Sequence, residues 1–222
     1  MGKTSDPSDS IVTETTDIGR RYEEYIQQKN EHPGMIAYDR WRELGRSFDI
    51  FVRNSVELLR MLTDFRDNGD LMVEVVLNQD PESQVKRDFF GRLDQRVHNF
   101  AASRASLVDH SRRHMKPYTG KPFSKEYTRR TNALAVLPSA VFVHDFRNFL
   151  LHYGVAPFVM RVSVDNSRES ETGSTLLASA GLLLFENWKP LSKQYIKDCQ
   201  PEIDLLSTVS EVYQAFDDLS TF

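Results

Sequence analysis

Apolar side chains recur at helical spacing along most of this chain, and this period constrains its fold more than any other feature. Two long segments show it most clearly, from about Met35 to Phe65 and from about Glu82 to Met115. When the second segment is projected at about 100° per residue, its large apolar side chains fall within one stripe about 120° wide. Because such a stripe must be buried against other helices, the sequence predicts a helical bundle.

Shorter segments complete the predicted bundle. Further helices are expected at about Asp17–Lys29, Leu71–Leu77, Ser124–Val136, Ala140–Tyr153, Leu191–Asp198 and Pro201–Leu219, with Ser139 as an N-cap and Gly154 as a helix stop. Beyond Gly154 the period changes to two, with strand-like segments at Phe158–Val164 and Thr175–Phe185 around a polar turn at Asp165–Ser174. The predicted fold is therefore mainly α-helical, with a β-hairpin inserted at about 157–186.

The chain has 222 residues, a length within the range of one domain. Residues 1–16 are rich in Ser, Thr and Asp and poor in apolar side chains, so we predict a disordered tail there. Residues 17–222 are predicted to form a single helical domain. A domain of this size needs no disulfide or metal to fold.

Several features bear on the cellular compartment. Cys199 is the only cysteine, no Asn-x-Ser/Thr sequon occurs, and the N-terminus carries no apolar signal region, so we expect a cytoplasmic location. The longest apolar run, Thr175–Phe185, is too short to cross a bilayer, so we expect no membrane partner.

The charge is distributed unevenly. Between Lys86 and Arg130 there are twelve Lys and Arg against four Asp and Glu, an excess of +8, whereas residues 196–222 carry an excess of −5. A basic segment of this kind is the electrostatic footprint that a phosphate-bearing partner uses. The alternative interpretation is a solvated helix face.

Arg104 falls in the centre of the apolar stripe of the Glu82–Met115 segment, where an isolated guanidinium is costly. We expect it either to form a buried salt bridge with a carboxylate on another helix or to serve a functional site. His98 and His110 point away from the stripe and are expected at the surface.

The helix expected at Ala140–Tyr153 has two distinct faces. Its apolar arc holds Phe142, Val143, Phe146, Phe149, Leu150 and Tyr153. The opposite arc holds Arg147, His144, Asn148, His152 and Asp145, interrupted by Leu151. A cation, an amide and two imidazoles on one face suit a phosphate ester, whereas the ordinary interpretation of such a face is a solvated or interface surface.

Chemistry on RNA needs few protein groups, because RNA carries its own nucleophile, the 2′-hydroxyl. A base for that proton, an acid for the leaving oxygen and a cation for the phosphorane are sufficient. The sequence contains no Cys cluster and no His-Glu-x-x-His motif, so we expect neither a metal site nor a cofactor.

The run from Arg147 to His152, followed by Tyr153 and Gly154, resembles the Arg-x(4 to 6)-His signature of the HEPN superfamily. Members are small helical bundles, commonly homodimers, and many are metal-independent ribonucleases of toxin–antitoxin, anti-phage or RNA-processing systems. The resemblance implies that Arg147 and His152 are a catalytic pair, with Asn148 as the polar residue after the arginine, at a dimer cleft. It also implies RNA as substrate and an antitoxin or regulatory protein as a further partner.

The remaining assignments follow from this resemblance. Arg104 would help to form the basic wall that guides RNA, and His144 and Tyr153 would bind substrate. Arg92 with His98 and Arg104 with His110 satisfy the same spacing, but neither arginine precedes an asparagine or lies in a polar arc. Two alternatives stay open, a non-catalytic module that binds a nucleotide or a protein, and a structural homodimer in which Arg147 pairs with an acid of its partner.

Overall fold

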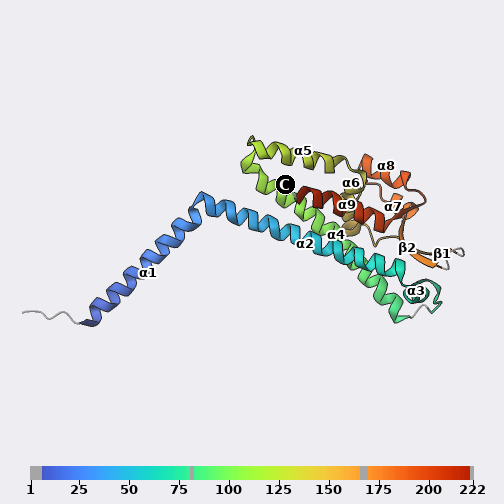
Figure 1. Ribbon diagram of the computed structural model, residues 1–222, viewed down its shortest axis with the longest axis horizontal. Helices are drawn as coiled ribbons and strands as arrows, with labels where there is room; N and C mark the ends of the chain where they lie inside the picture. The colour runs from blue at the N-terminus through green and yellow to red at the C-terminus, as the bar shows by residue number, and fades with distance from the viewer. Residues whose placement is uncertain (1–6, 81–82, 166–169, 221–222) are drawn as a thin grey trace, which may run out of the picture. The chain divides into compact units, whose positions relative to one another are not determined.

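The computed structural model describes residues 7–80, 83–165 and 170–220. The elements in chain order are α1 (Pro7–Glu31), α2 (Pro33–Asp67), α3 (Gly69–Met72), a π-helical turn (Val73–Leu77), α4 (Gln84–Met115), a 3-10 turn (Lys116–Tyr118), α5 (Pro122–Val136), α6 (Pro138–His152), β1 (Phe158–Asp165), β2 (Ser170–Ala178), α7 (Ser179–Leu183), α8 (Pro190–Asp198), β3 (Glu202–Asp204) and α9 (Leu205–Ser220) (Figure 1). The prediction of a mainly α-helical fold with an inserted hairpin is confirmed.

The chain divides into two compact units, residues 1–46 and residues 47–222, whereas the sequence analysis expected one domain over 17–222. The boundary falls inside α2, where no linker composition marks it. Within the first unit α1 begins at Pro7, so residues 7–16, which we assigned to a tail, are helical. The predicted tail residues 1–6 lie outside the described residues.

Proline marks the start of α1, α2, α5, α6 and α8. A first-turn proline is favourable because its missing N–H has no partner in the helix and its φ angle is already helical. The prediction of Ser139 as the N-cap of α6 was therefore wrong: Pro138 is the first helical residue, and the cap residue is Leu137.

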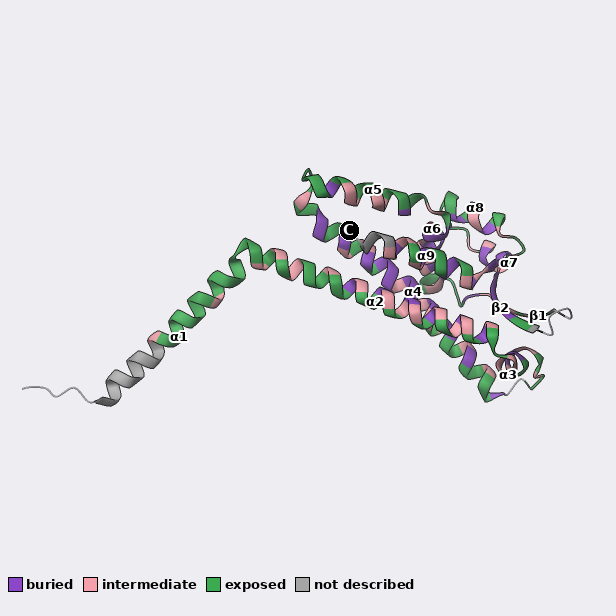
Figure 2. Ribbon diagram, in the orientation of Figure 1, coloured by how far each residue is buried: buried purple, intermediate pink, exposed green. Residues whose placement is uncertain are grey.

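The core of the second unit joins helices that are distant in sequence. The α4 stripe is buried as predicted, including Leu93, Val97, Phe100, Ala101 and Leu107. The ring centroid of Phe51 on α2 lies 6.0 Å from that of Phe100 on α4 and 5.0 Å from that of Phe216 on α9. Buried segments accordingly run along α4 and α6 in Figure 2.

The strands in the described part of the chain form a three-stranded antiparallel sheet in the order β1-β2-β3. Phe158 of β1 pairs with Leu177 of β2, and Leu177 pairs with Ile203 of β3. The second strand begins and ends earlier than predicted, because polar residues of the expected turn pair with β1 and residues 179–183 are helical. Residues 166–169 of the expected turn lie outside the described residues.

β3 lies in a segment that we predicted to be the start of the last helix. Its three residues are too few to show a period of two, and the apolar period of α9 begins directly after it.

Within the described residues no single helix is long and apolar enough to span a membrane. The helices α5 and α6, which meet at 74°, have sufficient length and apolar character only when taken together as a bent pair.

Gly173 of β2 is a position where only glycine fits, because a Cβ atom there would lie 2.5 Å from the carbonyl oxygen of Phe65. We expect Gly173→Ala to lower the free energy of unfolding by about 1–3 kcal/mol through overpacking. Gly91→Ala on α4 is the matched control, since no atom lies within 4 Å of its Cβ position and alanine favours the helix. The free energies of unfolding are measured with denaturant. Equal losses of stability in both variants would show that the contact at Gly173 is not tight.

Candidate functional site

A cluster of aromatic rings fixes the orientation of α6, the helix that carries the Arg147–His152 motif. Phe142, Phe146 and Phe149 lie on one face of α6 and are buried. The ring of Trp188 stacks at 5.7 Å from Phe142 and 5.8 Å from Phe149, and its Nε1 donates a hydrogen bond of 2.7 Å to the carbonyl of Leu182. The predicted apolar face of α6 is thus confirmed at these positions.

We expected Asp145 in the polar arc of this helix. It is instead buried, with 3% of its surface exposed. Its Oδ2 accepts hydrogen bonds of 2.7 Å from the Ser192 hydroxyl and 3.3 Å from the backbone N–H of Lys189. The Lys189 Nζ lies 3.1 Å from its Oδ1. The carboxylate therefore sits at the start of α8, where the helix dipole and a cation both stabilise its charge.

Arg147 is half-buried on α6 and has no hydrogen bond or ion pair in the described part of the chain. Its Nε is fully buried without an acceptor. A buried donor without a partner costs about 1–3 kcal/mol of folding free energy, so this nitrogen destabilises the folded chain.

The other two motif residues differ from Arg147 in environment. His152 is exposed at the last position of α6, and Asn148 is half-buried. No hydrogen bond joins Arg147 to His152, which are about 140° apart around the helix. The motif pair of one chain is therefore not assembled into a single contact. Tyr153, just beyond the helix, stacks on Phe149 with a centroid distance of 5.2 Å while half of its surface stays exposed.

Arg104 is buried on α4 with 5% of its surface exposed. The salt bridge that we considered for it is not formed by any described carboxylate; instead its guanidinium carbon lies 5.5 Å from the ring centroid of Phe216. Its Nε is a second buried arginine nitrogen without an acceptor. Burial lowers the pKa of Arg104 to about 10, helped by Arg112 and opposed by Asp145 and Asp109. The side chain stays charged at neutral pH.

His144 of α6 is electrostatically coupled to Arg104. Burial lowers the pKa of its imidazole below the ordinary value, and the positive charges of Arg104 and Lys189 lower it further, against the opposing effect of Asp145. At neutral pH His144 is therefore a neutral ring, which can both accept and donate a hydrogen bond. The packing of α4 on α6 thus brings together two of the predicted site residues, Arg104 and His144.

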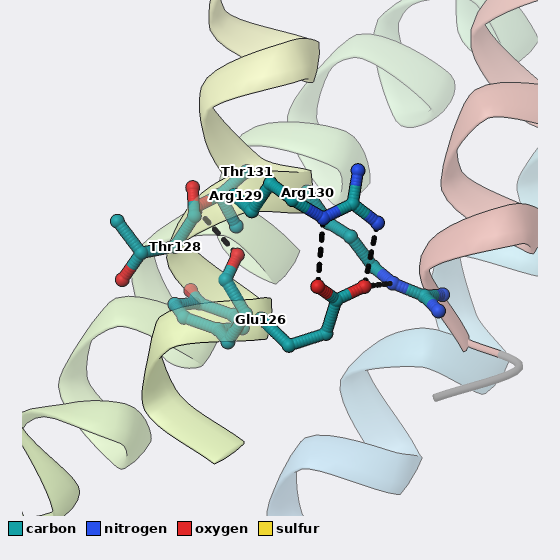
Figure 3. A network of polar contacts seen from close by, with 6 residues as sticks. Glu126, Thr128, Arg129, Arg130 and Thr131 are labelled. Atoms are coloured by element: carbon teal, nitrogen blue, oxygen red, sulfur yellow. Dashed lines mark hydrogen bonds and ion pairs between the residues drawn. The ribbon is translucent and has the colours of Figure 1, made fainter. Parts of the chain in front are cut away.

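The basic segment is partly neutralised by acids. Glu126 on α5 accepts hydrogen bonds of 2.7 Å and 2.6 Å from Arg129 and one of 2.8 Å from Arg130 (Figure 3). These hydrogen bonds lower the pKa of Glu126 to about 2, and the one from Arg129 has the larger effect. The lysines at 116, 121 and 125 are exposed, so a reduced basic surface remains along this part of the chain.

Two other Arg–His pairs have the spacing of the motif, Arg92 with His98 and Arg104 with His110, and side chains of both pairs already have partners within the protein or are partly buried. His110, which we expected at the surface, is half-buried and its Nδ1 lies 2.6 Å from the Ser47 hydroxyl. The Nε of Arg92 donates a 3.1 Å hydrogen bond to the carbonyl of Asp88, and His98 is also half-buried.

Among the described residues no group of three or more His, Cys, Asp and Glu side chains is arranged to hold a metal ion. Comparison with protein-family models, with curated proteins and with solved structures finds no match for this chain.

The role of Asp145 is open to a direct test. Asp145→Ala removes two hydrogen bonds and an ion pair, so we expect the free energy of unfolding to fall by about 2–3 kcal/mol. Asp109→Ala is the matched control, because Asp109 is exposed and lies 4.0 Å from Arg112, and it should cost no more than about 0.5 kcal/mol. Similar denaturation midpoints for the two variants would show that Asp145 does not hold α6 to α8.

Proposed function

We propose that this chain is a metal-independent endoribonuclease of the HEPN type, with Arg147 and His152 as its catalytic pair. The observation that supports the proposal most is the Arg147 guanidinium, whose buried Nε has no acceptor within the described residues. A phosphate oxygen would supply that acceptor and would make a charge-assisted hydrogen bond.

The chemistry assigns one role to each residue. His152 accepts the proton of the RNA 2′-hydroxyl as this oxygen attacks the adjacent phosphorus, and Arg147 stabilises the charge of the phosphorane. The bond from phosphorus to the 5′-oxygen of the next nucleotide then breaks, and that oxygen takes up a proton. The products are a 2′,3′-cyclic phosphate and a 5′-hydroxyl.

The helical geometry supports a site that two chains share. Since Arg147 and His152 of one α6 diverge by about 140°, one chain presents them to different sides. Two copies facing each other would set the Arg147 of one against the His152 of the other. Leu151, which is 43% exposed between the polar residues, would lie in such a contact.

The surrounding residues have supporting roles in this proposal. Asn148 offers an amide beside the phosphate, and Tyr153 offers a half-exposed ring on which a base can stack. His144, held neutral by its surroundings, would bind substrate, and Arg104 would act mainly through its charge because its side chain is buried. The exposed lysines at 116, 121 and 125 would attract the RNA backbone.

A binding module without cleavage is the second candidate. It is favoured by the absence of any described hydrogen bond that orients the His152 ring, whereas a catalytic histidine is commonly held by a partner. An antitoxin or regulatory protein could then occupy the same face of α6.

Cleavage of RNA separates these candidates. The purified chain is incubated with structured and single-stranded RNAs in excess EDTA, and the 3′ ends are mapped. We expect cyclic phosphate ends with the wild type and at least about a hundredfold slower cleavage with Arg147→Ala or His152→Ala.

The matched control is the double variant Arg92→Ala, His98→Ala, which removes an Arg–His pair of similar spacing on α4 and should cleave at the wild-type rate. Equal cleavage by all variants would reject the α6 motif as the site. Binding of RNA by a folded wild type without any cleavage would favour the binding module.

A further inference from the structure

The part of the first compact unit whose side chains the structure describes, residues 17–46, carries large apolar side chains at its surface. Between residues 17 and 46 no side chain is buried. Five of the apolar and aromatic side chains there are more than half exposed, namely Ile18, Tyr22, Tyr25, Tyr38 and Trp41. Figure 2 shows the coloured part of α1 as mostly exposed. A soluble surface seldom carries so many large apolar groups within so few residues unless it is an interface.

These side chains follow the spacing of a helix–helix seam. Ile18, Tyr22 and Tyr25 are four and three residues apart on α1, and Tyr38 and Trp41 are three apart on α2. Alternating steps of three and four keep side chains on one face of a helix, as in coiled-coil packing. Each helix of this unit therefore presents an apolar stripe.

Four charged residues of α1 form ion pairs with each other. Arg20 lies 2.7 Å from Asp17 and 2.9 Å from Glu24, and Arg21 lies 2.9 Å from Asp17. Exposed pairs of this kind stabilise a helix by only about 0.2–0.5 kcal/mol each. Since most helix stability in proteins comes from packing of an apolar face, these pairs alone do not account for a helix of 25 residues.

The charge of the unit favours one kind of partner. Residues 17–46 contain six Lys and Arg and six Asp and Glu, so this segment is neutral. An RNA or an anionic membrane would bind best to a positive surface. A neutral surface is not repelled by an identical one, so it is compatible with a second copy of this chain.

The apolar area is also sufficient for self-association. An aromatic side chain can bury about 150–250 Å², so a side chain that is more than half exposed offers on the order of 100 Å². Five such side chains on each of two chains give on the order of 1,000 Å², near the lower limit of about 1,200 Å² for specific interfaces. Flanking residues would supply the difference.

We infer that the stripes of residues 17–46 are the contact surface for a second copy of this chain. The contact is isologous, with the same patch on both copies. It is formed by residues other than the α6 motif and does not depend on Arg147 or His152. In the dimer of the proposed ribonuclease, these stripes hold the two chains together, and the α6 faces alone are too small a contact to do so.

Sedimentation velocity on the full chain over a dilution series tests this inference. We expect a dimer for the wild type and a monomer for the double variant Tyr22→Glu, Tyr25→Glu. Leu184→Glu is the matched control, because Leu184 is an apolar residue of the second unit with 68% exposure, and this variant should stay dimeric. Near-UV circular dichroism of the aromatic cluster reports that the second unit stays folded in each variant.

Acrylamide quenching of tryptophan fluorescence supplies an independent readout. Trp188 is buried, so the quenchable emission comes from Trp41. Quenching should be weak in the dimer and several-fold stronger in the double variant. A monomeric wild type would overturn the inference. A double variant that remains dimeric, or Trp41 protected only when anionic vesicles or RNA are added, would overturn it as well.

Discussion

The buried carboxylate of Asp145 is the contact on which the arrangement around α6 depends. It stabilises the start of α8 through Ser192 and Lys189, and it holds α6 against α8 on the side where Trp188 stacks on the α6 phenylalanines. Because this carboxylate and the aromatic rings together determine the rotation of α6, they also determine which residues remain on its free side. Arg147, Asn148 and His152 lie outside these contacts, as does the exposed Leu151.

Two kinds of arginine environment can be compared among the described residues. Some are satisfied by acids, such as Arg129 and Arg130 with Glu126, or Arg161, which lies 2.8 Å from Glu202. Arg104 and Arg147 instead each keep a buried Nε without an acceptor, on two helices that pack together. Each such donor lowers the stability of the folded chain. A bound anion that accepted the hydrogen bonds would offset this cost.

Periodic features could be predicted from the sequence, and long-range polar contacts could not. The apolar stripe of α4 and the apolar face of α6 follow directly from spacing, and the hairpin follows from the change of period. The burial of Asp145 depends on partners 44 and 47 residues away in the sequence, which no local pattern reveals. Local patterns also do not reveal the partner of Arg104. We considered a salt bridge to a carboxylate, and the guanidinium instead lies over the ring of Phe216.

Other differences have local causes. β3 was not predicted because its three residues are too few to show a period. A signal for the helix starts was present in the prolines at 33, 122, 138 and 190, each of which is the first residue of a helix.

If the Arg147 guanidinium binds a phosphate oxygen, as we propose, nuclear magnetic resonance of the arginine Nε–H groups will detect the new hydrogen bond. Nitrogen-labelled protein is titrated with an oligonucleotide that lacks the 2′-hydroxyl and so cannot be cleaved. We expect a saturable shift of the Arg147 Nε–H signal, while the signal of Arg161, which is paired with Glu202, stays in place. An Arg147 signal that does not move when the oligonucleotide binds, or no binding at all, would show that Arg147 does not hold a phosphate.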